Sequence, residues 1–111
     1  MNIFELPSDL PQDEEQLEIL LQDKGQGVRI ERILSTGQAS PPGFWYEQAQ
    51  NEWVVLLQGQ AELAWDDGSV IPLQKGDWVF IPAHRRHRIN WTSAAPPCIW
   101  LAVHYGSYFR R

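Results

Sequence analysis

Turn-forming residues divide most of this chain into short apolar runs, and this division limits the possible folds more than any other sequence feature. From Val28 onward, segments such as STGQASPPG, DDG and SAAPP separate the runs. Within the runs apolar and polar residues alternate, as they do over 61–65. Such alternation is typical of strands with one buried face, and turn signals about every eight to twelve residues are typical of all-β domains. We therefore predict a β-sandwich, barrel or jelly roll.

The alternating runs predict about seven strands. In the first run, Val28 and Ile30 alternate with Arg29 and Glu31, which indicates a strand with one buried face. Asp66-Asp67-Gly68 is predicted as the turn of a hairpin. The expected strands occupy residues 28–34, 46–58, 61–65, 70–73, 75–82, 87–91 and 98–105.

The residues before the first run follow a different pattern. Leu17, Leu20 and Leu21 have helical spacing, and the acids of 13–15 that precede them suit a helix N-terminus. We therefore predict one short helix over 13–21, within an N-terminal extension of residues 1–27. Residues 28–111 are predicted to form one β-barrel domain, because a chain of 111 residues has room for a single core.

The charge of the chain argues against nucleic acid as a partner. The formal net charge is −5, and seven of the fourteen acids lie between Glu5 and Asp23. The one basic cluster, formed by Arg85, Arg86 and Arg88, is more typical of a solvated loop than of a phosphate site. No signal peptide and no long apolar segment is present in the sequence, so we expect a cytoplasmic protein without membrane association.

The usual nucleophile and phosphate motifs are missing from the sequence. Cys98 is the single cysteine, so the chain cannot form an intrachain disulfide. Its neighbours Pro97 and Ile99 favour a buried, inert thiol over a catalytic one. The sequence contains no G-x-S-x-G segment, phosphate loop or dinucleotide fingerprint.

Two groups of residues have spacings that are more specific than those of a general β domain. Glu52 is followed after six residues by Gly59, and Gly76 is followed by Pro82 and then by His87. These spacings resemble the two motifs of the cupin superfamily, whose members are small β-barrels. The resemblance covers 28–105 and implies a cupin-type β-barrel or jelly roll. It also implies that Glu52 and His87 stand at metal-ligand positions.

The first motif lacks the histidine pair that cupins usually have. Depending on the register, the pair is replaced by Tyr46 and Gln48 or by Trp45 and Glu47. In an unbroken strand Tyr46 and Gln48 share a face with Glu52, so we favour the first register, although a bulge would reverse it. In the second motif His84 stands where cupins have glycine, and Trp91 stands where they have asparagine.

The resemblance raises the possibility of a divalent zinc, iron, manganese or nickel ion, since imidazole and carboxylate suit these metals. Glu52 and His87 would supply two ligands, and the third would come from Gln48, Tyr46, His84 or His104. The competing interpretation of His104 is a buried histidine whose nitrogens are satisfied by its neighbours. For Glu52 it is a carboxylate paired with an arginine.

Aromatic residues surround the first motif, and the chain has six tryptophans. They either fill the barrel or form a wall for a planar or apolar ligand. The residues predicted to contact a ligand are Tyr46, Trp45, His84 and Trp91.

Two functions remain open at this point. One is a binding protein or enzyme that holds a small organic molecule through a metal on Glu52 and His87. The other is a metal-free binding or sensor module with an aromatic and amide pocket. No catalytic acid or base is assigned, so the sequence leaves open whether the protein is an enzyme. Because small cupins commonly dimerise, the resemblance also implies a homodimer.

Overall fold

The computed structural model describes residues 1–106, and these contain eight β-strands. No helix of the described residues is long and apolar enough to cross a membrane. The strands are β1 (Gln16–Asp23), β2 (Val28–Ser35), β3 (Asn51–Gln58), β4 (Ala61–Trp65), β5 (Val70–Leu73), β6 (Trp78–Ile81), β7 (His87–Thr92) and β8 (Cys98–Tyr105).

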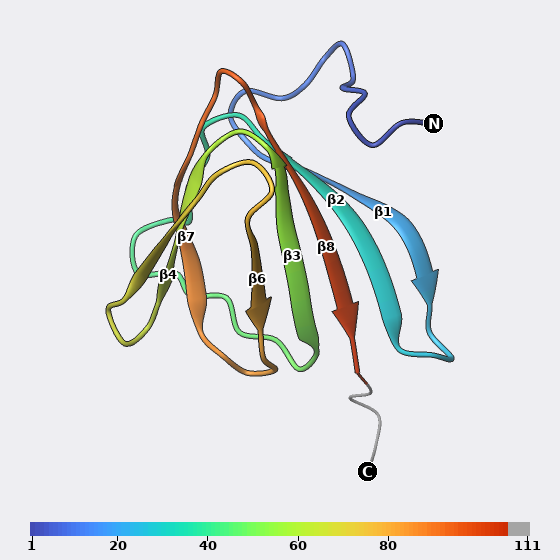
Figure 1. Cartoon of the computed structure of the whole chain (residues 1–111), viewed down its shortest axis with the longest axis vertical. Helices are drawn as coiled ribbons and strands as arrows, with labels where there is room; N and C mark the ends of the chain where they lie inside the picture. Colours follow the sequence, from blue (N-terminus) through green and yellow to red (C-terminus); the bar gives the residue numbers. More distant parts are fainter. Residues whose placement is uncertain (107–111) are drawn as a thin grey trace.

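The strands form two antiparallel sheets that face one another (Figure 1). The larger sheet has the order β1-β2-β8-β3-β6, and the smaller one has the order β5-β4-β7. The long connection from β2 to β3 and the pairing of β2 with β8 bring residues far apart in the sequence side by side. The all-β prediction is therefore confirmed.

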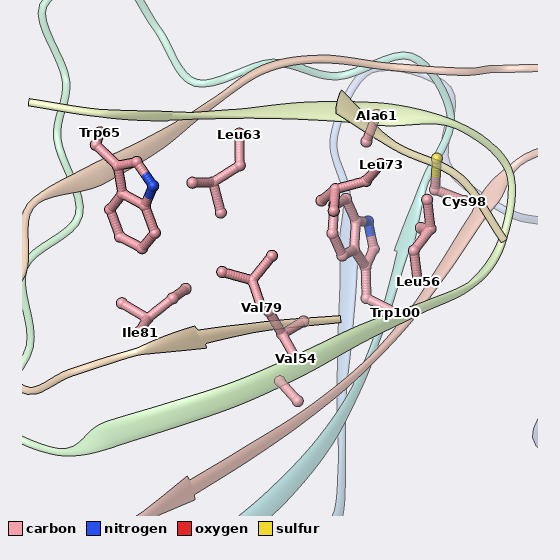
Figure 2. Packing of buried hydrophobic residues seen from close by; sticks show 11 residues of the cluster. Val54, Leu56, Ala61, Leu63, Trp65, Leu73, Val79, Ile81, Cys98 and Trp100 are labelled. Atoms are coloured by element: carbon pink, nitrogen blue, oxygen red, sulfur yellow. The ribbon is translucent and has the colours of Figure 1, made fainter. Parts of the chain in front are cut away.

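The hydrophobic core lies between the sheets, because each strand turns alternate side chains inward. In Figure 2, Leu63 and Trp65 of β4 point toward Val54 of β3 and toward Val79 and Ile81 of β6. Leu63 and Ile81 are each 1% exposed, so this contact is fully closed to water. Toward the other end of the core, Leu56, Ala61, Leu73, Cys98 and Trp100 complete the packing.

The predicted helix over 13–21 is wrong, because this segment forms β1 and the described residues contain no helix. β1 pairs with β2 along its length, from Gln16 opposite Leu34 to Asp23 opposite Val28. A short amphipathic helix gains little stability by itself, whereas the open edge of β2 offers a full row of backbone hydrogen bonds. The division of the chain at residue 27 stays a prediction.

The predicted strand over 46–58 is shorter than expected and begins at Asn51. Tyr46 forms only an isolated bridge with His87, whose two backbone hydrogen bonds measure 2.7 and 3.1 Å. Residues 43–50 therefore form a loop that is attached to β7 through Tyr46.

Candidate functional site

A cavity of about 420 Å³ lies between the two sheets, beside the hydrophobic core. This volume is within the usual range for small-molecule sites. Its floor is apolar, formed by Val54, Leu63, Ile81 and Trp100, which also belong to the core. Its walls carry polar and charged side chains from β2, β3, β7 and β8, from the loops over 38–41 and 46–48, and from residues 13–15.

The first polar group in the cavity is a pair formed by Gln48 and Glu52. The Gln48 side-chain amide donates a 2.6 Å hydrogen bond to Oε1 of Glu52. Glu52 begins the inward face of β3 and is only 8% exposed. Glu52 Oε2 makes no hydrogen bond with the described residues, and the side chain lines the cavity, so this oxygen is available to a ligand.

His87 lies at the start of β7, directly opposite the core residue Trp65 of β4, and is 5% exposed. Its Nδ1 is 3.1 Å from the backbone carbonyl of Arg85, which can only accept, so Nδ1 carries the proton. In the neutral imidazole, Nε2 is then an acceptor, and it has no partner among residues 1–106. Tyr46 stacks on this imidazole, with ring centroids 5.5 Å apart and planes inclined by 25°.

A second charged group in the cavity contains His104, Glu31 and Arg29. Nε2 of His104 is 3.0 Å from Oε1 of Glu31, and Nε of Arg29 is 2.6 Å from the other carboxylate oxygen. Burial acts to raise the pKa of Glu31, but the His104 hydrogen bond and the charges of His104 and Arg29 outweigh it. The pKa of Glu31 therefore lies below its usual value.

Residues of the N-terminal segment also line the cavity. Burial raises the pKa of Glu15 above its usual value, and the nearby charge of Glu31 adds to this shift. The pKa of Tyr46 is also raised, by burial and by the charges of Glu15 and Glu52. The charges of Glu15 and Glu52 thus both act on Tyr46, and the charge of Glu31 acts on Glu15.

The structure brings together five of the residues predicted for the site, namely Glu52, His87, Gln48, His104 and Tyr46. Tyr46 and Gln48 share the cavity with Glu52, as the favoured register predicts. The reason differs from the predicted one, because Tyr46 is positioned by its bridge to β7 and not by an unbroken strand.

The other three predicted pocket residues do not line the cavity. Trp45 is partly exposed, with the guanidinium of Arg86 5.7 Å from its ring centroid. His84 is exposed in a turn with φ of 67°, and Trp91 is 43% exposed on β7. Their predicted role in ligand contact therefore has no support from the geometry.

Sequence reasoning missed the contribution of β2 to the site. Its alternation predicted one buried face, but the cavity lies on the face of Arg29, Glu31 and Ile33, while Ile30 pairs with Val103 on the other side. The sequence did contain a signal for this face. Ile33 and Ser35 follow Glu31 at every second position, so they share its face of β2.

The side chains that could bind a metal ion are not grouped as a metal ion requires. Within residues 1–106, no group of three His, Cys, Asp or Glu side chains is placed to hold a metal ion. Glu52 and His87 both line the cavity, but one Glu52 oxygen accepts from Gln48, and Nε2 of His104 is paired with Glu31. The residues present therefore do not form the three-ligand set of a typical catalytic metal site. The predicted metal ligands stay a prediction.

Comparison with known proteins agrees with the fold and with the motif spacings. The model of the cupin domain family, Cupin_2, matches residues 31–104, which include both motifs. No curated protein gives a match.

Solved structures give a similar result. A crystal structure from Ralstonia eutropha JMP134, described as a "putative mannose-6-phosphate isomerase", is 43% identical, with a TM-score of 0.85, covering 96% of this chain and 97% of that one. A cupin superfamily protein from Desulfitobacterium hafniense is 20% identical with a TM-score of 0.71, covering 87% and 82%. A cupin 2 conserved barrel domain protein from Rhodopseudomonas palustris is 17% identical with a TM-score of 0.68, covering 96% and 71%. The last two similarities concern the fold alone.

Proposed function

The chain belongs to the cupin family, and on this premise we propose that it binds a small organic molecule in the cavity between its two sheets. Glu52, Gln48 and His87 orient the molecule by hydrogen bonds, while Val54, Leu63 and Trp100 contact its apolar part. An apolar floor with a few convergent polar groups is the usual composition of small-molecule sites.

The observation that carries this proposal is a pair of unpartnered acceptors that line one cavity. Glu52 and His87 are 8% and 5% exposed, yet Glu52 Oε2 and His87 Nε2 have no hydrogen-bond partner among the described residues. Both side chains line the cavity, and no buried side-chain nitrogen or oxygen of the described residues lacks a hydrogen-bond partner, so these two acceptors are open to the cavity. A ligand that donates to both atoms would take the place of water there, and no metal is needed for it to do so.

The test is a thermal-shift screen of a broad metabolite library in the presence of a chelator, followed by calorimetry on the hits. We expect at least one hit whose affinity falls about tenfold or more in His87→Ala, because a buried acceptor is lost. His84→Ala is the control, since His84 is exposed and outside the cavity. Hits with equal affinity for both variants would place binding elsewhere and refute the proposal.

A metal-assisted site is the second candidate function, and the motif positions of Glu52 and His87 within one cavity favour it. In this case Gln48 or His104 would complete the set with zinc, iron, manganese or nickel, and the ion would supply a Lewis acid. His104 could join only after leaving Glu31.

Elemental analysis of protein purified without chelator separates the two candidates. Near-stoichiometric metal that disappears in His87→Ala would support the second candidate. Less than about a tenth of an equivalent after reconstitution, together with ligand binding in chelator, would leave the metal-free function.

The partner expected from the resemblance, a second copy of the chain, also stays a proposal. The outer face of the large sheet supports it, because one apolar row crosses all five strands through residues that pair directly. The row is Leu21, Ile30, Val103, Trp53 and Phe80. Trp78, beside it on β6, is 61% exposed. An apolar sheet face of this kind is typical of homodimer interfaces.

Sedimentation analysis of Trp78→Lys tests the dimer. A wild-type dimer that becomes a monomer in this variant is the expected result. Trp91→Lys is a matched control, because Trp91 is also an exposed tryptophan but lies on β7 of the other sheet. A monomeric wild type would contradict the proposal.

A further inference from the structure

The charges around the cavity are strongly unequal. Acidic groups line it from three segments of the chain, whereas one arginine and no lysine line it. The acids are Asp13, Glu14, Glu15, Glu31 and Glu52. A cleft with charges of one sign and apolar walls concentrates its field, so it attracts the opposite charge and repels its own.

The single arginine does not offset this charge for a ligand. Nε of Arg29 is 2.6 Å from Glu31, whose other oxygen is 3.0 Å from His104. Glu31 is thus already compensated by two partners, and the charge of Arg29 is paired with Glu31 through Nε. A phosphate or carboxylate that enters the cavity would find no arginine or lysine without a carboxylate partner among the residues that line it.

Glu52 is in the opposite situation, because no cation lies within salt-bridge distance of it among residues 1–106. It is 8% exposed, and its hydrogen-bond partner is the neutral amide of Gln48. A buried charge without a counter-charge costs free energy, which a cationic ligand would offset.

Hydrogen-bonding capacity favours the same kind of ligand. Glu52 Oε2 is an acceptor, and so is His87 Nε2 when Nδ1 carries the single ring proton, so a ligand with several donors suits this end of the cavity. An ammonium group supplies three donors and a positive charge together. Next to these acceptors, Tyr46 stacks on His87 and also lines the cavity, so an aromatic ring lies near the place of the ammonium group.

We infer that the cavity selects a small organic cation, with its ammonium group against Glu52 and His87, and that it discriminates against phosphorylated ligands. This inference depends on the proposed function, since it names the class of molecule that the same cavity binds. The inferred ligand also differs from the sugar phosphate in the name of the Ralstonia relative, because a sugar phosphate carries the charge that this cavity repels.

Ligands that share one scaffold and differ in charge test the inference directly. Mannosamine, mannose and mannose 6-phosphate form such a set, and amines, alcohols and phosphates of other scaffolds from the metabolite screen form further sets. Affinities are measured by calorimetry with chelator present, so that a metal cannot mediate binding. We expect the amine to bind about tenfold or more tightly than the neutral member, and the phosphate to bind most weakly.

Two variants then test whether Glu52 causes the preference for amines. Glu52→Gln keeps a side-chain oxygen for Gln48 but removes the charge, so the ratio of amine to neutral affinity should fall toward one. Glu47→Gln makes the same chemical change at an exposed residue outside the cavity, and there the ratio should stay at its wild-type value.

Neutral or phosphorylated compounds that bind the cavity more tightly than their amine counterparts would overturn the inference and leave the proposed function standing. An unchanged ratio in Glu52→Gln would overturn the assignment of Glu52. If no compound of any charge binds, both the inference and the proposed function fail.

Discussion

Gly59, which ends the first motif, should be the least replaceable glycine of the barrel. It lies in the turn from β3 to β4 with φ of 94°, a conformation that side chains rarely adopt. A Cβ at this position would lie 2.7 Å from Sγ of Cys98, 2.9 Å from the Ser93 hydroxyl and 3.0 Å from the Cys98 Cα. These neighbours cannot move easily, because Cys98 is fully buried and its thiol is 3.2 Å from the backbone oxygen of Gln60.

The expected cost of Gly59→Ala has two parts. The positive φ contributes roughly 1–2 kcal/mol, and the overlap with Cys98 and Ser93 contributes roughly 1–3 kcal/mol. We therefore expect the free energy of unfolding to fall by about 3 kcal/mol. Denaturant unfolding followed by tryptophan fluorescence measures this change.

Gly68→Ala separates the two parts. Gly68 has nearly the same φ, 92°, but a Cβ there would meet no atom within 4 Å. Its replacement should cost only the backbone part, about 1–2 kcal/mol, so the difference between the two variants isolates the steric overlap. Cys98→Ala in the Gly59→Ala background should recover part of that difference, as a positive coupling of about 1 kcal/mol. If Gly59→Ala is no more destabilising than Gly68→Ala, close packing at this turn is not what requires glycine.

Three further predictions concern the charged groups and the site. Glu31→Ala should lower the free energy of unfolding by about 3 kcal/mol, because it leaves the buried imidazole of His104 without its partner. Denaturant unfolding of this variant measures the change, and a value below about 1 kcal/mol would contradict the prediction. Because the pKa of Glu31 is lower in the folded protein, its ionised form stabilises the fold above its unfolded pKa of about 4.3, and this stabilisation is lost as pH falls through the folded pKa. In Glu31→Gln the free energy of unfolding should therefore fall less steeply as the pH is lowered. An acid limb of unchanged slope would show that other carboxylates, such as Glu18 beside Arg32, account for it. Trp45→Ala should leave the affinity of any cavity ligand within about twofold, since Trp45 does not line the cavity, whereas Trp100→Ala should weaken an apolar contact and lower affinity about tenfold; equal effects in a titration would refute this placement.

Local chemistry was enough to predict much of the barrel. Strand alternation and turn residues depend on nearest neighbours, so strands such as 61–65 and 70–73 and the hairpin at Asp66-Asp67-Gly68 could be placed from the sequence. The same reasoning failed at β1, where helical spacing of leucines is compatible with a strand once the edge of β2 is available. Backbone hydrogen bonding to β2 decided in favour of the strand over the helix.

The site divides in a similar way. The sequence by itself determined that Glu52 and His87 stand at the two motif positions, because the motifs are fixed spacings along the chain. Only the tertiary structure decided that Glu31 and Arg29 face the cavity, that His104 is paired with Glu31, and that Trp45 and Trp91 do not line the cavity. The physical reason is that alternation shows two faces of a strand without showing which one the second sheet covers. That choice depends on packing between residues far apart in the sequence.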